Sequence, residues 1–233
     1  MKAFFHRFDR LISYNEQIFT TIYIDPLKGP LYWASHKNRL IESCQYLFKL
    51  NAASLLEKIE KEFLDKLLRS KKNGRARIRL YFFNNKLRAL GYFDTPPNLS
   101  HTSFTDFHKK IINSGFSIYK HYRDPHLPNF IKIPNYFPYS LEKKELLLES
   151  VNPHYGIVES YFSNIVCEKR GLFFIPKKES GMYQGIMLGE WKKQFPDNFI
   201  EKKITKEFLR DCDKIYLCNA LYGVRESVII KNL

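Results

Sequence analysis

Residues 156–166 read GIVESYFSNIV and place a glutamate inside a run of β-branched and aromatic residues. Such a run after a turn-marking glycine predicts a β-strand. Because side chains alternate along a strand, Ile157, Glu159, Tyr161 and Ser163 would share one face. Glu159 then has two interpretations: it lies on the solvated face of an edge strand, or it is a buried acid that holds a cationic partner. The stretch alone favours the edge strand.

The composition indicates a folded globular protein. The chain has 233 residues, of which 44% are hydrophobic and 16% aromatic, enough for a buried core in one domain or two small ones. No apolar run is as long as a membrane span. The N-terminal stretch MKAFFHRFDRLISYNE contains acidic residues and no small-residue cleavage site, so we predict no signal peptide. We therefore expect a cytoplasmic protein without a membrane partner.

The cysteines and histidines do not predict a metal site. Four cysteines are scattered without CxxC spacing, which also argues against a disulfide framework: Cys44, Cys167, Cys212 and Cys218. The seven histidines lie far apart and form no HExxH pair.

The formal net charge of +14 would suit nucleic acid, an anionic membrane surface or small anionic substrates. Yet lysine and arginine are mixed with glutamate, as in EKIEKEFLDKLLRSKK at 57–72, a pattern typical of the solvated face of a helix. No RNP-type or helix-turn-helix pattern accompanies the charge. Nucleic-acid binding therefore rests on charge alone and is a weak inference, and a small anionic substrate is the partner that we expect.

The first half of the chain predicts two hairpins and two helices. Residues 16–34 form β-rich runs around the turn DPLKG, and RARIRLYFF (75–83) with KLRALGYF (86–93) forms a second hairpin. Between them we expect a helix with Ser35 as its N-cap and another helix over 53–70, both with apolar residues at helical spacing.

The second half predicts a mixture of strands and short helices after the irregular stretch DTPPNLSHTSF. We place the boundary between two α+β domains near there, giving domains 1–115 and 116–233. Strand-like segments begin at FSIYKHYR, EKKELLLES, GLFFIPKKES and KIYLCNALYGV, and helices follow Gly185 and lie within KITKEFLRDC.

Four further residues could carry chemistry, although each has an ordinary alternative. Arg39, on the first helix, is either a solvated surface residue or a clamp for a phosphate. Lys132, in a proline-bounded loop, is either exposed or an amine nucleophile. Gly185 is either a plain turn or the start of a helix that presents its N–H groups to an anion, and Asn219 is a polar break at the end of an apolar strand.

In order along the chain, these pieces resemble the class IV aminotransferase family of pyridoxal phosphate enzymes. The HxxRL and ExxxxN pieces are general to this class, whereas PHL followed by IK, GIM and CNAL are similar to its aminodeoxychorismate lyase branch. The matching pieces are FTT (19–21), HKNRL (36–40), DPHLPNFIKIPN (124–135), GIVESYFSNIV (156–166), IP (175–176), QGIM (184–187) and LCNAL (217–221).

The resemblance implies roles for these residues toward pyridoxal 5'-phosphate. Lys132 would bond covalently to the cofactor and move protons, and Glu159 would keep the pyridine nitrogen protonated. Arg39 would bind the phosphate. Backbone N–H groups of two segments would help it: Gly185, Ile186 and Met187 form one, and Asn219 and Ala220 form the other.

Substrate contacts follow from the same resemblance. Thr20 and Thr21 lie where the substrate side would be, and either Arg77 or Arg79 could pair with a substrate carboxylate. From the sequence these two arginines are equivalent, and surface exposure is an alternative for both.

The implied fold is α+β and of two domains, the D-amino acid aminotransferase-like fold type IV, with a C-terminal α/β pseudo-barrel shortened at its end. The resemblance further implies a homodimer. The implied reaction is a carbon–oxygen lyase step that converts 4-amino-4-deoxychorismate to 4-aminobenzoate and pyruvate in folate biosynthesis. Two alternatives remain: a class IV transaminase on a small amino acid, and a catalytically degenerate member acting as a basic binding protein.

Overall fold

The computed structural model describes residues 17–84, 86–96, 99, 101, 111–114, 117–121, 131, 146–150, 152–160 and 162–229. These residues divide into two compact units. Unit 1 contains the described residues up to Leu99 together with Ile131, and unit 2 contains the remainder. Each unit is described by itself. The boundary predicted at residue 115 lies outside the described residues and stays a prediction.

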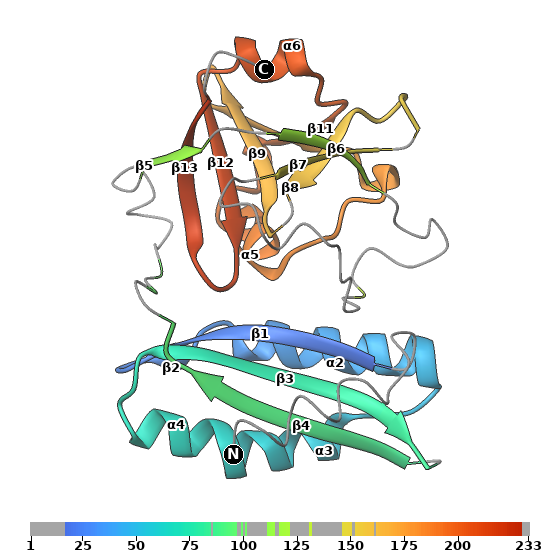
Figure 1. Cartoon of the computed structure of the whole chain (residues 1–233), viewed down its shortest axis with the longest axis vertical. Coiled ribbons are helices and arrows are strands. Elements are labelled where there is room, and N and C mark those ends of the chain that lie inside the picture. The colour runs from blue at the N-terminus through green and yellow to red at the C-terminus, as the bar shows by residue number, and fades with distance from the viewer. Residues whose placement is uncertain are drawn as a thin grey trace. The chain divides into compact units, whose positions relative to one another are not determined.

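Unit 1 contains a four-stranded antiparallel sheet with the strand order β2-β1-β3-β4 (Figure 1). Both predicted hairpins are confirmed. The strands are β1 (Gln17–Asp25), β2 (Gly29–Pro30), β3 (Gly74–Phe83) and β4 (Lys86–Asp94). The turn between β1 and β2 closes because the Asp25 carboxylate accepts the backbone N–H groups of Leu27 and Lys28.

The helices of unit 1 lie along one face of this sheet (Figure 1). They are α2 (Trp33–Phe48), α3 (Ala53–Ile59), a π-helical turn (Glu60–Leu64) and α4 (Asp65–Arg69). The helix predicted over 53–70 is therefore confirmed, with a π-bulge inside it. The predicted N-cap Ser35 is wrong: Tyr32 takes a left-handed conformation (φ 56°) and turns the chain early, so α2 already begins at Trp33.

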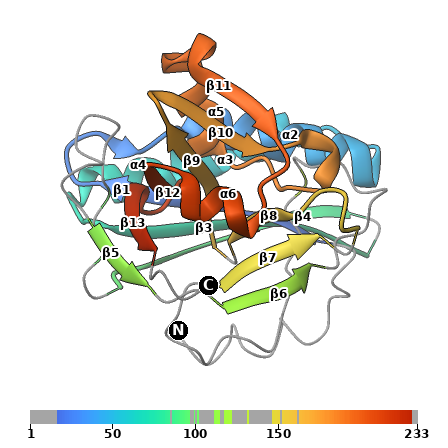
Figure 2. The same cartoon turned by 90° about the horizontal axis from the view of Figure 1, so that it is seen from above.

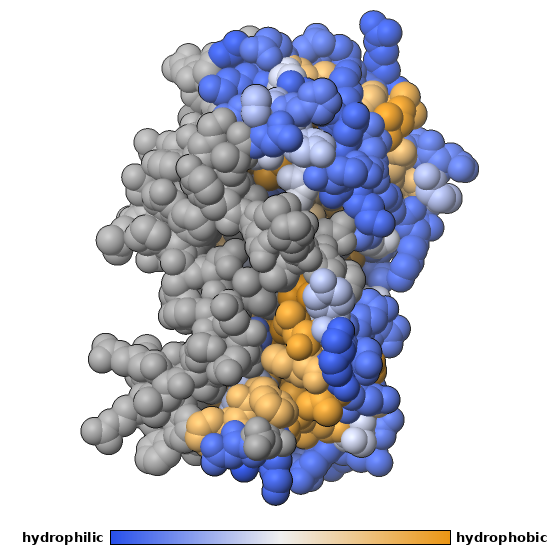
Figure 3. All heavy atoms as spheres, turned by 90° about the vertical axis from the view of Figure 1, so that its right-hand side faces the viewer, coloured by the Kyte–Doolittle hydropathy of each residue, from blue (hydrophilic) through white to orange (hydrophobic). Residues whose placement is uncertain are grey.

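Strand alternation gives the sheet of unit 1 two different faces. On the helix-covered face, Ile18, Ile22, Ile78 and Leu80 are fully buried. The opposite face is more polar: it carries Thr21 of β1 and the arginines of β3, together with the aromatic ring of Phe19. Where β3 turns into β4, apolar side chains gather at the surface: Phe48 stacks on Phe82 at 6.1 Å and Phe83 is exposed (Figure 3).

Unit 2 contains a six-stranded sheet, ordered β11-β10-β9-β12-β13-β5, and a three-stranded sheet, ordered β6-β7-β8. Strands β6 and β7 lie side by side and run parallel (Figure 2). The strands are β5 (Ile111–Ser114), β6 (Ser117–His121), β7 (Leu146–Ser150), β8 (Ile157–Ser160), β9 (Asn164–Lys169), β10 (Leu172–Pro176), β11 (Phe199–Lys202), β12 (Lys214–Asn219) and β13 (Gly223–Ile229). The helices are α5 (Ile186–Gln194) and α6 (Lys206–Asp211), with 3-10 turns at Lys178–Ser180 and Pro196–Asn198.

The stretch GIVESYFSNIV does not form the single strand predicted from its composition. β8 ends at Ser160 and β9 begins at Asn164, and the two strands belong to different sheets. The corner between them is closed by Ser160, whose N–H donates to the Ser163 carbonyl (2.8 Å) and whose hydroxyl accepts the Ser163 N–H (3.1 Å). A serine hydroxyl that bonds to nearby backbone competes with the ladder of a strand, and here it ends one.

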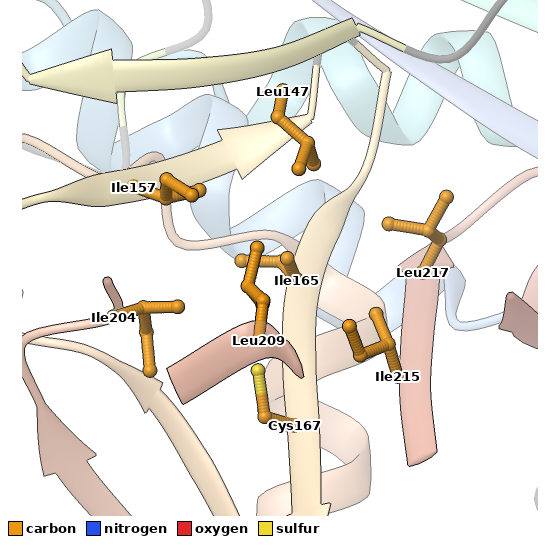
Figure 4. Packing of buried hydrophobic residues seen from close by; sticks show 8 residues of the cluster. All are labelled: Leu147, Ile157, Ile165, Cys167, Ile204, Leu209, Ile215 and Leu217. Atoms are coloured by element: carbon orange, nitrogen blue, oxygen red, sulfur yellow. The ribbon is translucent and has the colours of Figure 1, made fainter. Parts of the chain in front are cut away.

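The core of unit 2 fills the space between the two sheets and α6 (Figure 4). Its buried side chains come from β7, β8, β9, β12 and the region of α6: Leu147, Ile157, Ile165, Cys167, Ile204, Leu209, Ile215 and Leu217. The cluster thereby fixes β8, which carries Glu159, against the larger sheet. In the described part of the chain, no helix is long and apolar enough to cross a membrane.

Gly156 lets β8 start in close contact with the segment before α6. Its φ is +71°, and a Cβ at this position would lie 2.3 Å from the carbonyl oxygen of Ile204. The same oxygen accepts the N–H of Ile157 at 2.8 Å. Only glycine allows this approach, because any other residue would meet both a strained φ and the carbonyl.

We therefore expect Gly156→Ala to lower the free energy of unfolding by about 3 kcal/mol, from the left-handed conformation and the steric overlap together. Gly171→Ala is the matched control, because Gly171 also has a positive φ (+76°) but open space around its Cβ position. It should cost only about 1 kcal/mol. Denaturant unfolding of both variants measures the difference, and equal losses would contradict the role of the Ile204 carbonyl.

Candidate active site

Glu159 is buried, with only 8% of its surface exposed. It lies on β8, whose four side chains are all buried although β8 is the edge strand of its sheet. Its carboxylate accepts the backbone N–H of Tyr183 at 3.3 Å. The interpretation as the solvated face of an edge strand is therefore wrong. A buried carboxylate is costly unless hydrogen bonds or a cation compensate it, and this burial supports the alternative of a buried acid with a cationic partner.

Asn164, the first residue of β9, holds the segment before α5 in place. Its side-chain amide donates to the carbonyl of Tyr183, and its carbonyl oxygen accepts the N–H of Gly185 at 3.0 Å. Asn164 is itself buried. Together with the bond from Tyr183 to Glu159, these contacts place the start of α5 beside the corner between β8 and β9.

Gly185 is the N-cap of α5 and leaves the first turn of the helix without a side-chain cap. A Cβ on Gly185 would lie 2.3 Å from the Asn164 side-chain oxygen, so glycine is required for this bond. The side chains of Ile186 and Met187 are buried, and their contribution to a ligand would come from the backbone N–H groups. The N-terminus of a helix attracts anions through such groups and through the helix dipole.

Asn219 shapes the turn between β12 and β13 with all of its polar side-chain atoms. Its carbonyl oxygen accepts the N–H groups of Leu221 (3.0 Å) and Tyr222 (2.8 Å). Its amide donates to the Ser163 hydroxyl at 2.9 Å and to the Phe162 carbonyl at 3.1 Å. The Asn219 side chain is therefore a structural element of the turn and not a free ligand.

One backbone N–H group in this turn, that of Ala220, was predicted to bind the cofactor phosphate. Within the described part of the chain, the backbone N–H of Ala220 makes no hydrogen bond. Because Asn219 bonds to Ser163, this turn lies beside the same β8–β9 corner as the start of α5. Unit 2 thus brings Glu159, Gly185 and the Asn219–Ala220 turn together.

In unit 1, Arg39 is buried, with 9% of its surface exposed. Its guanidinium donates to the Thr20 hydroxyl at 2.7 Å, and the same hydroxyl bonds to Nδ1 of His36. Thr20 and His36 are both fully buried. The interpretation of Arg39 as a solvated helix residue is wrong. A buried hydroxyl that accepts from a guanidinium fixes its orientation, and an ordered guanidinium is suited to binding an anion.

The residues predicted to contact the substrate, Thr21, Arg77 and Arg79, lie on the opposite face of the same sheet. In the strand register Thr21 pairs with Arg77 and Phe19 pairs with Arg79. Arg79 is buried, whereas Thr21 and Arg77 are half-buried. Unit 1 thus brings Thr21 and Arg77 together as direct neighbours.

Lys132 lies outside the described residues, so its predicted role stays a prediction. Ile131, which precedes it, is fully buried. The remaining predicted residues fall into two groups, one in each unit. Arg39, Thr21, Arg77 and Arg79 belong to unit 1, and Glu159, Gly185, Ile186, Met187, Asn219 and Ala220 belong to unit 2.

Sequence reasoning did not assign roles to several supporting residues. Two of them stand inside motifs that it had identified: His36 begins HKNRL, and Asn164 ends the ExxxxN piece that Glu159 begins. Thr20 of FTT did receive a role, because it was expected beside Thr21 on the substrate side. The structure instead turns it to the helix-covered face, where it is buried and binds Arg39. Ser163 and Tyr183 act through hydrogen bonds over 56 and 24 residues of sequence, and no local pattern shows such bonds.

Comparison with known sequences agrees with this geometry. The sequence model of the amino-transferase class IV family matches residues 17–228, which is nearly the whole chain. The chain belongs to the class IV aminotransferase family. No curated protein matches it by sequence.

Solved structures show the same fold. The branched-chain amino acid aminotransferase from Escherichia coli has a TM-score of 0.73 at 15% identity, covering 94% of this chain and 79% of that one. The 4-amino-4-deoxychorismate lyase from Pseudomonas aeruginosa has a TM-score of 0.69 at 18% identity, covering 93% and 84%. A fold IV transaminase from Curtobacterium pusillum has a TM-score of 0.69 at 16% identity, covering 94% and 80%. The predicted α+β fold of type IV is confirmed.

Members of this family use pyridoxal phosphate, and the residues of unit 2 fit that cofactor. A buried carboxylate suits a protonated pyridine nitrogen. The uncapped start of α5, which only a glycine can form beside Asn164, suits a phosphate. In the described residues, no group of three or more histidine, cysteine, aspartate or glutamate side chains could hold a metal ion.

We expect Gly185→Ala to weaken binding of pyridoxal phosphate at least tenfold, because the new methyl group displaces Asn164 and moves the start of α5. Gly189→Ala, in the same helix, is the control: its Cβ position is open. Alanine is also the better helix former by up to about 1 kcal/mol, so this variant should keep the affinity and gain stability. Fluorescence titration with the cofactor measures both, and unchanged affinity in Gly185→Ala would contradict the role of this cradle.

Proposed function

We propose that this chain is a pyridoxal phosphate-dependent lyase that converts 4-amino-4-deoxychorismate to 4-aminobenzoate and pyruvate. The observation that carries the cofactor assignment is the buried Glu159 carboxylate, held beside the glycine-capped start of α5. One group matches the ring nitrogen and the other matches the phosphate. The choice of the lyase rests on the pieces PHL–IK, GIM and CNAL, and the similarity to the fold of the P. aeruginosa lyase is consistent with it.

In this proposal each residue has one task. Glu159 holds a proton at the pyridine nitrogen, and the hydrogen bond from Tyr183 keeps its carboxylate in place. In unit 2 the N–H groups of Ile186 and Ala220 are the donors proposed for the phosphate. The resemblance also assigns the phosphate to Arg39, whose guanidinium is oriented by Thr20 within unit 1. When bound, pyridoxal phosphate supplies an electron sink for the negative charge that develops at the substrate.

Lys132 is the proposed base. Its Nζ removes the proton from the amine-bearing ring carbon of the substrate. The carbon–oxygen bond to the enolpyruvyl group then breaks, and the electrons of the former carbon–hydrogen bond complete the aromatic ring. The leaving group takes up one proton and becomes pyruvate, so that one substrate yields one 4-aminobenzoate and one pyruvate.

A transaminase is the second candidate, because the E. coli branched-chain enzyme has a fold that is similar to the same degree. Purified protein with added pyridoxal phosphate and 4-amino-4-deoxychorismate should release 4-aminobenzoate and pyruvate in equal amounts. Keto acid formed from common amino acids, with no 4-aminobenzoate, would reject the lyase and favour the transaminase. A colourless protein that takes up no cofactor would reject both enzymes. It would favour the third alternative, a catalytically degenerate family member that acts as a basic binding protein. For either enzyme we expect a homodimer.

Lys132→Ala should abolish catalysis and remove covalent attachment of the cofactor. Borohydride reduction of the wild-type protein, followed by peptide mapping, should find the cofactor on the peptide that contains Lys132. Lys206→Ala is the control because Lys206 is an exposed lysine at the start of α6. Full labelling and activity in Lys132→Ala would reject the proposed base.

Glu159→Gln should keep the fold and the cofactor but lower kcat by about 100-fold or more, since a neutral amide no longer holds the ring nitrogen protonated. The glutamine carbonyl can still accept the Tyr183 N–H, so the thermal midpoint should stay close to that of the wild type. Steady-state kinetics with a parallel cofactor titration separates the two effects. Wild-type kcat in this variant would show that Glu159 does not serve the cofactor.

A further inference from the structure

Two cysteines that are far apart in the sequence meet in the core of unit 2. Cys167 lies on β9 and is fully buried. Cys212 is the C-cap of α6 and is half-buried. All four cysteines of the chain lie among the described residues, and Cys212 is the one that is not fully buried. The pair therefore joins a buried thiol to one that solvent can reach.

Backbone hydrogen bonds fix the segment after α6 beside β9. The N–H of Asp213 donates to the carbonyl of Glu168 at 2.8 Å, so the residues that follow the two cysteines are bonded to each other. In the register of β12 with β9, Ile215 pairs with Cys167. The N–H of Cys212 donates to the Phe208 carbonyl at 3.0 Å and closes the last turn of α6. Neither cysteine is thus on a free loop.

The two sulfur atoms meet at Leu209. The Cys167 sulfur points toward Leu209 of α6 (Figure 4). The Cys212 thiol donates to the carbonyl of the same leucine at 3.1 Å. The Cys167 thiol in turn donates a hydrogen bond to the Cys212 sulfur. Because the two sulfur atoms are already in contact, only a small approach is needed to reach the length of a disulfide bond, about 2 Å.

This contact makes the two thiols unequal in reactivity. The hydrogen bond from Cys167 lowers the pKa of the Cys212 thiol, although burial and the neighbouring carboxylates of Asp213 and Asp211 act in the opposite direction. The same bond, together with burial, raises the pKa of Cys167. Since the thiolate is the form that attacks an oxidant, Cys212 is the more reactive of the two and also the more accessible.

We infer that Cys167 and Cys212 are an oxidative modification site, which a hydroperoxide converts to a reversible disulfide. In the first step the Cys212 sulfur attacks hydrogen peroxide and becomes a sulfenic acid, while the O–O bond breaks and the second oxygen leaves as water with the thiol proton. The Cys167 sulfur then attacks the sulfenic sulfur. The S–O bond breaks, and its oxygen leaves as water with the Cys167 proton. Two thiols and one peroxide thus give one disulfide and two waters.

The disulfide would crosslink β9 to the end of α6. It closes a loop that runs through β10, α5 and β11, so it restricts the unfolded chain and stabilises the folded one. We expect the thermal midpoint of the oxidised chain to lie about 5–10 °C above that of the reduced chain. The inference does not depend on the cofactor or on the proposed reaction, because neither cysteine belongs to the candidate active site.

The test treats the purified full chain with hydrogen peroxide and counts its thiols. After unfolding, N-ethylmaleimide should label all four cysteines of the reduced chain and two fewer in the oxidised chain. Mass spectrometry of the proteolytic peptides should find Cys167 linked to Cys212. Dithiothreitol should restore the missing labels and return the thermal midpoint to its reduced value.

Three variants assign the two steps. Cys212→Ala should form no disulfide and show no rise in the thermal midpoint. Cys167→Ala should leave Cys212 as a sulfenic acid, which dimedone labels. Cys44→Ala is the matched control, since Cys44 is a buried cysteine of unit 1, and this variant should form the same disulfide as the wild type. The half-buried position of Cys212 keeps the test valid through Cys212→Ala if Cys167→Ala fails to fold.

Three results would overturn the inference. The first is a wild type that keeps all its thiols at a peroxide concentration that oxidises free cysteine. The second is a wild type in which peroxide converts Cys212 to a sulfinic acid while Cys167 stays a thiol, because the second thiol would then not reach the first. The third is a disulfide between any other two cysteines. A thermal midpoint that falls on oxidation would reject the stabilising crosslink.

Discussion

The two hydrogen bonds of the Asn164 side chain are the interaction on which the rest of the site in unit 2 depends. The amide donates to Tyr183 and accepts from Gly185, so a side chain with both a donor and an acceptor is required. Each such bond contributes about 1 kcal/mol, whereas leaving a buried partner unpaired costs about 1–3 kcal/mol. This asymmetry explains why position 185 is a glycine: a side chain there would push away the Asn164 oxygen and leave buried groups unpaired.

The corner between β8 and β9 extends this arrangement to the rest of the unit. Ser160 and Ser163 close the corner, and Ser163 also accepts a hydrogen bond from Asn219 in the β12–β13 turn. Glu159 and Asn164, on either side of the corner, bind the segment before α5. A single stretch of eleven residues, 156–166, therefore positions the acid, the helix start and the turn, and a shift of this stretch would move all three.

The sequence predicts those parts of the fold that local patterns determine. Hydrophobic alternation and turn residues locate both hairpins of unit 1, and helical spacing locates its helices. The prediction fails where a single residue departs from the local pattern, through a side chain that bonds to the backbone or through an unusual backbone conformation. Ser160, which has a place in any alternating strand pattern, ends β8 through its hydroxyl, and Tyr32 starts α2 early although it is not a glycine.

The candidate site shows the same limit. Motif resemblance identifies Arg39, Glu159 and Gly185, but the partners that hold them are known only from tertiary contacts, such as Asn164 with Gly185 over 21 residues. Periodicity also cannot say how the arginines of β3 differ, since Arg75, Arg77 and Arg79 occupy equivalent positions on one face. Their difference arises from β1 and β4, which supply an aspartate to Arg75 and aromatic rings to Arg77.

Strand geometry gives the adjacent threonines of FTT two separate tasks. Because side chains alternate along β1, Thr20 points to the helix-covered face and Thr21 to the opposite one. Thr20 therefore meets Arg39 of α2, while Thr21 lies across from Arg77 of β3. The two threonines thus lie beside two arginines, Arg39, proposed for the phosphate, and Arg77, one of two candidates for a substrate carboxylate. A slip of β1 by one residue would exchange the two faces and separate both threonines from their arginines, so the register of β1 with β3 is as important to the proposed chemistry as either charge.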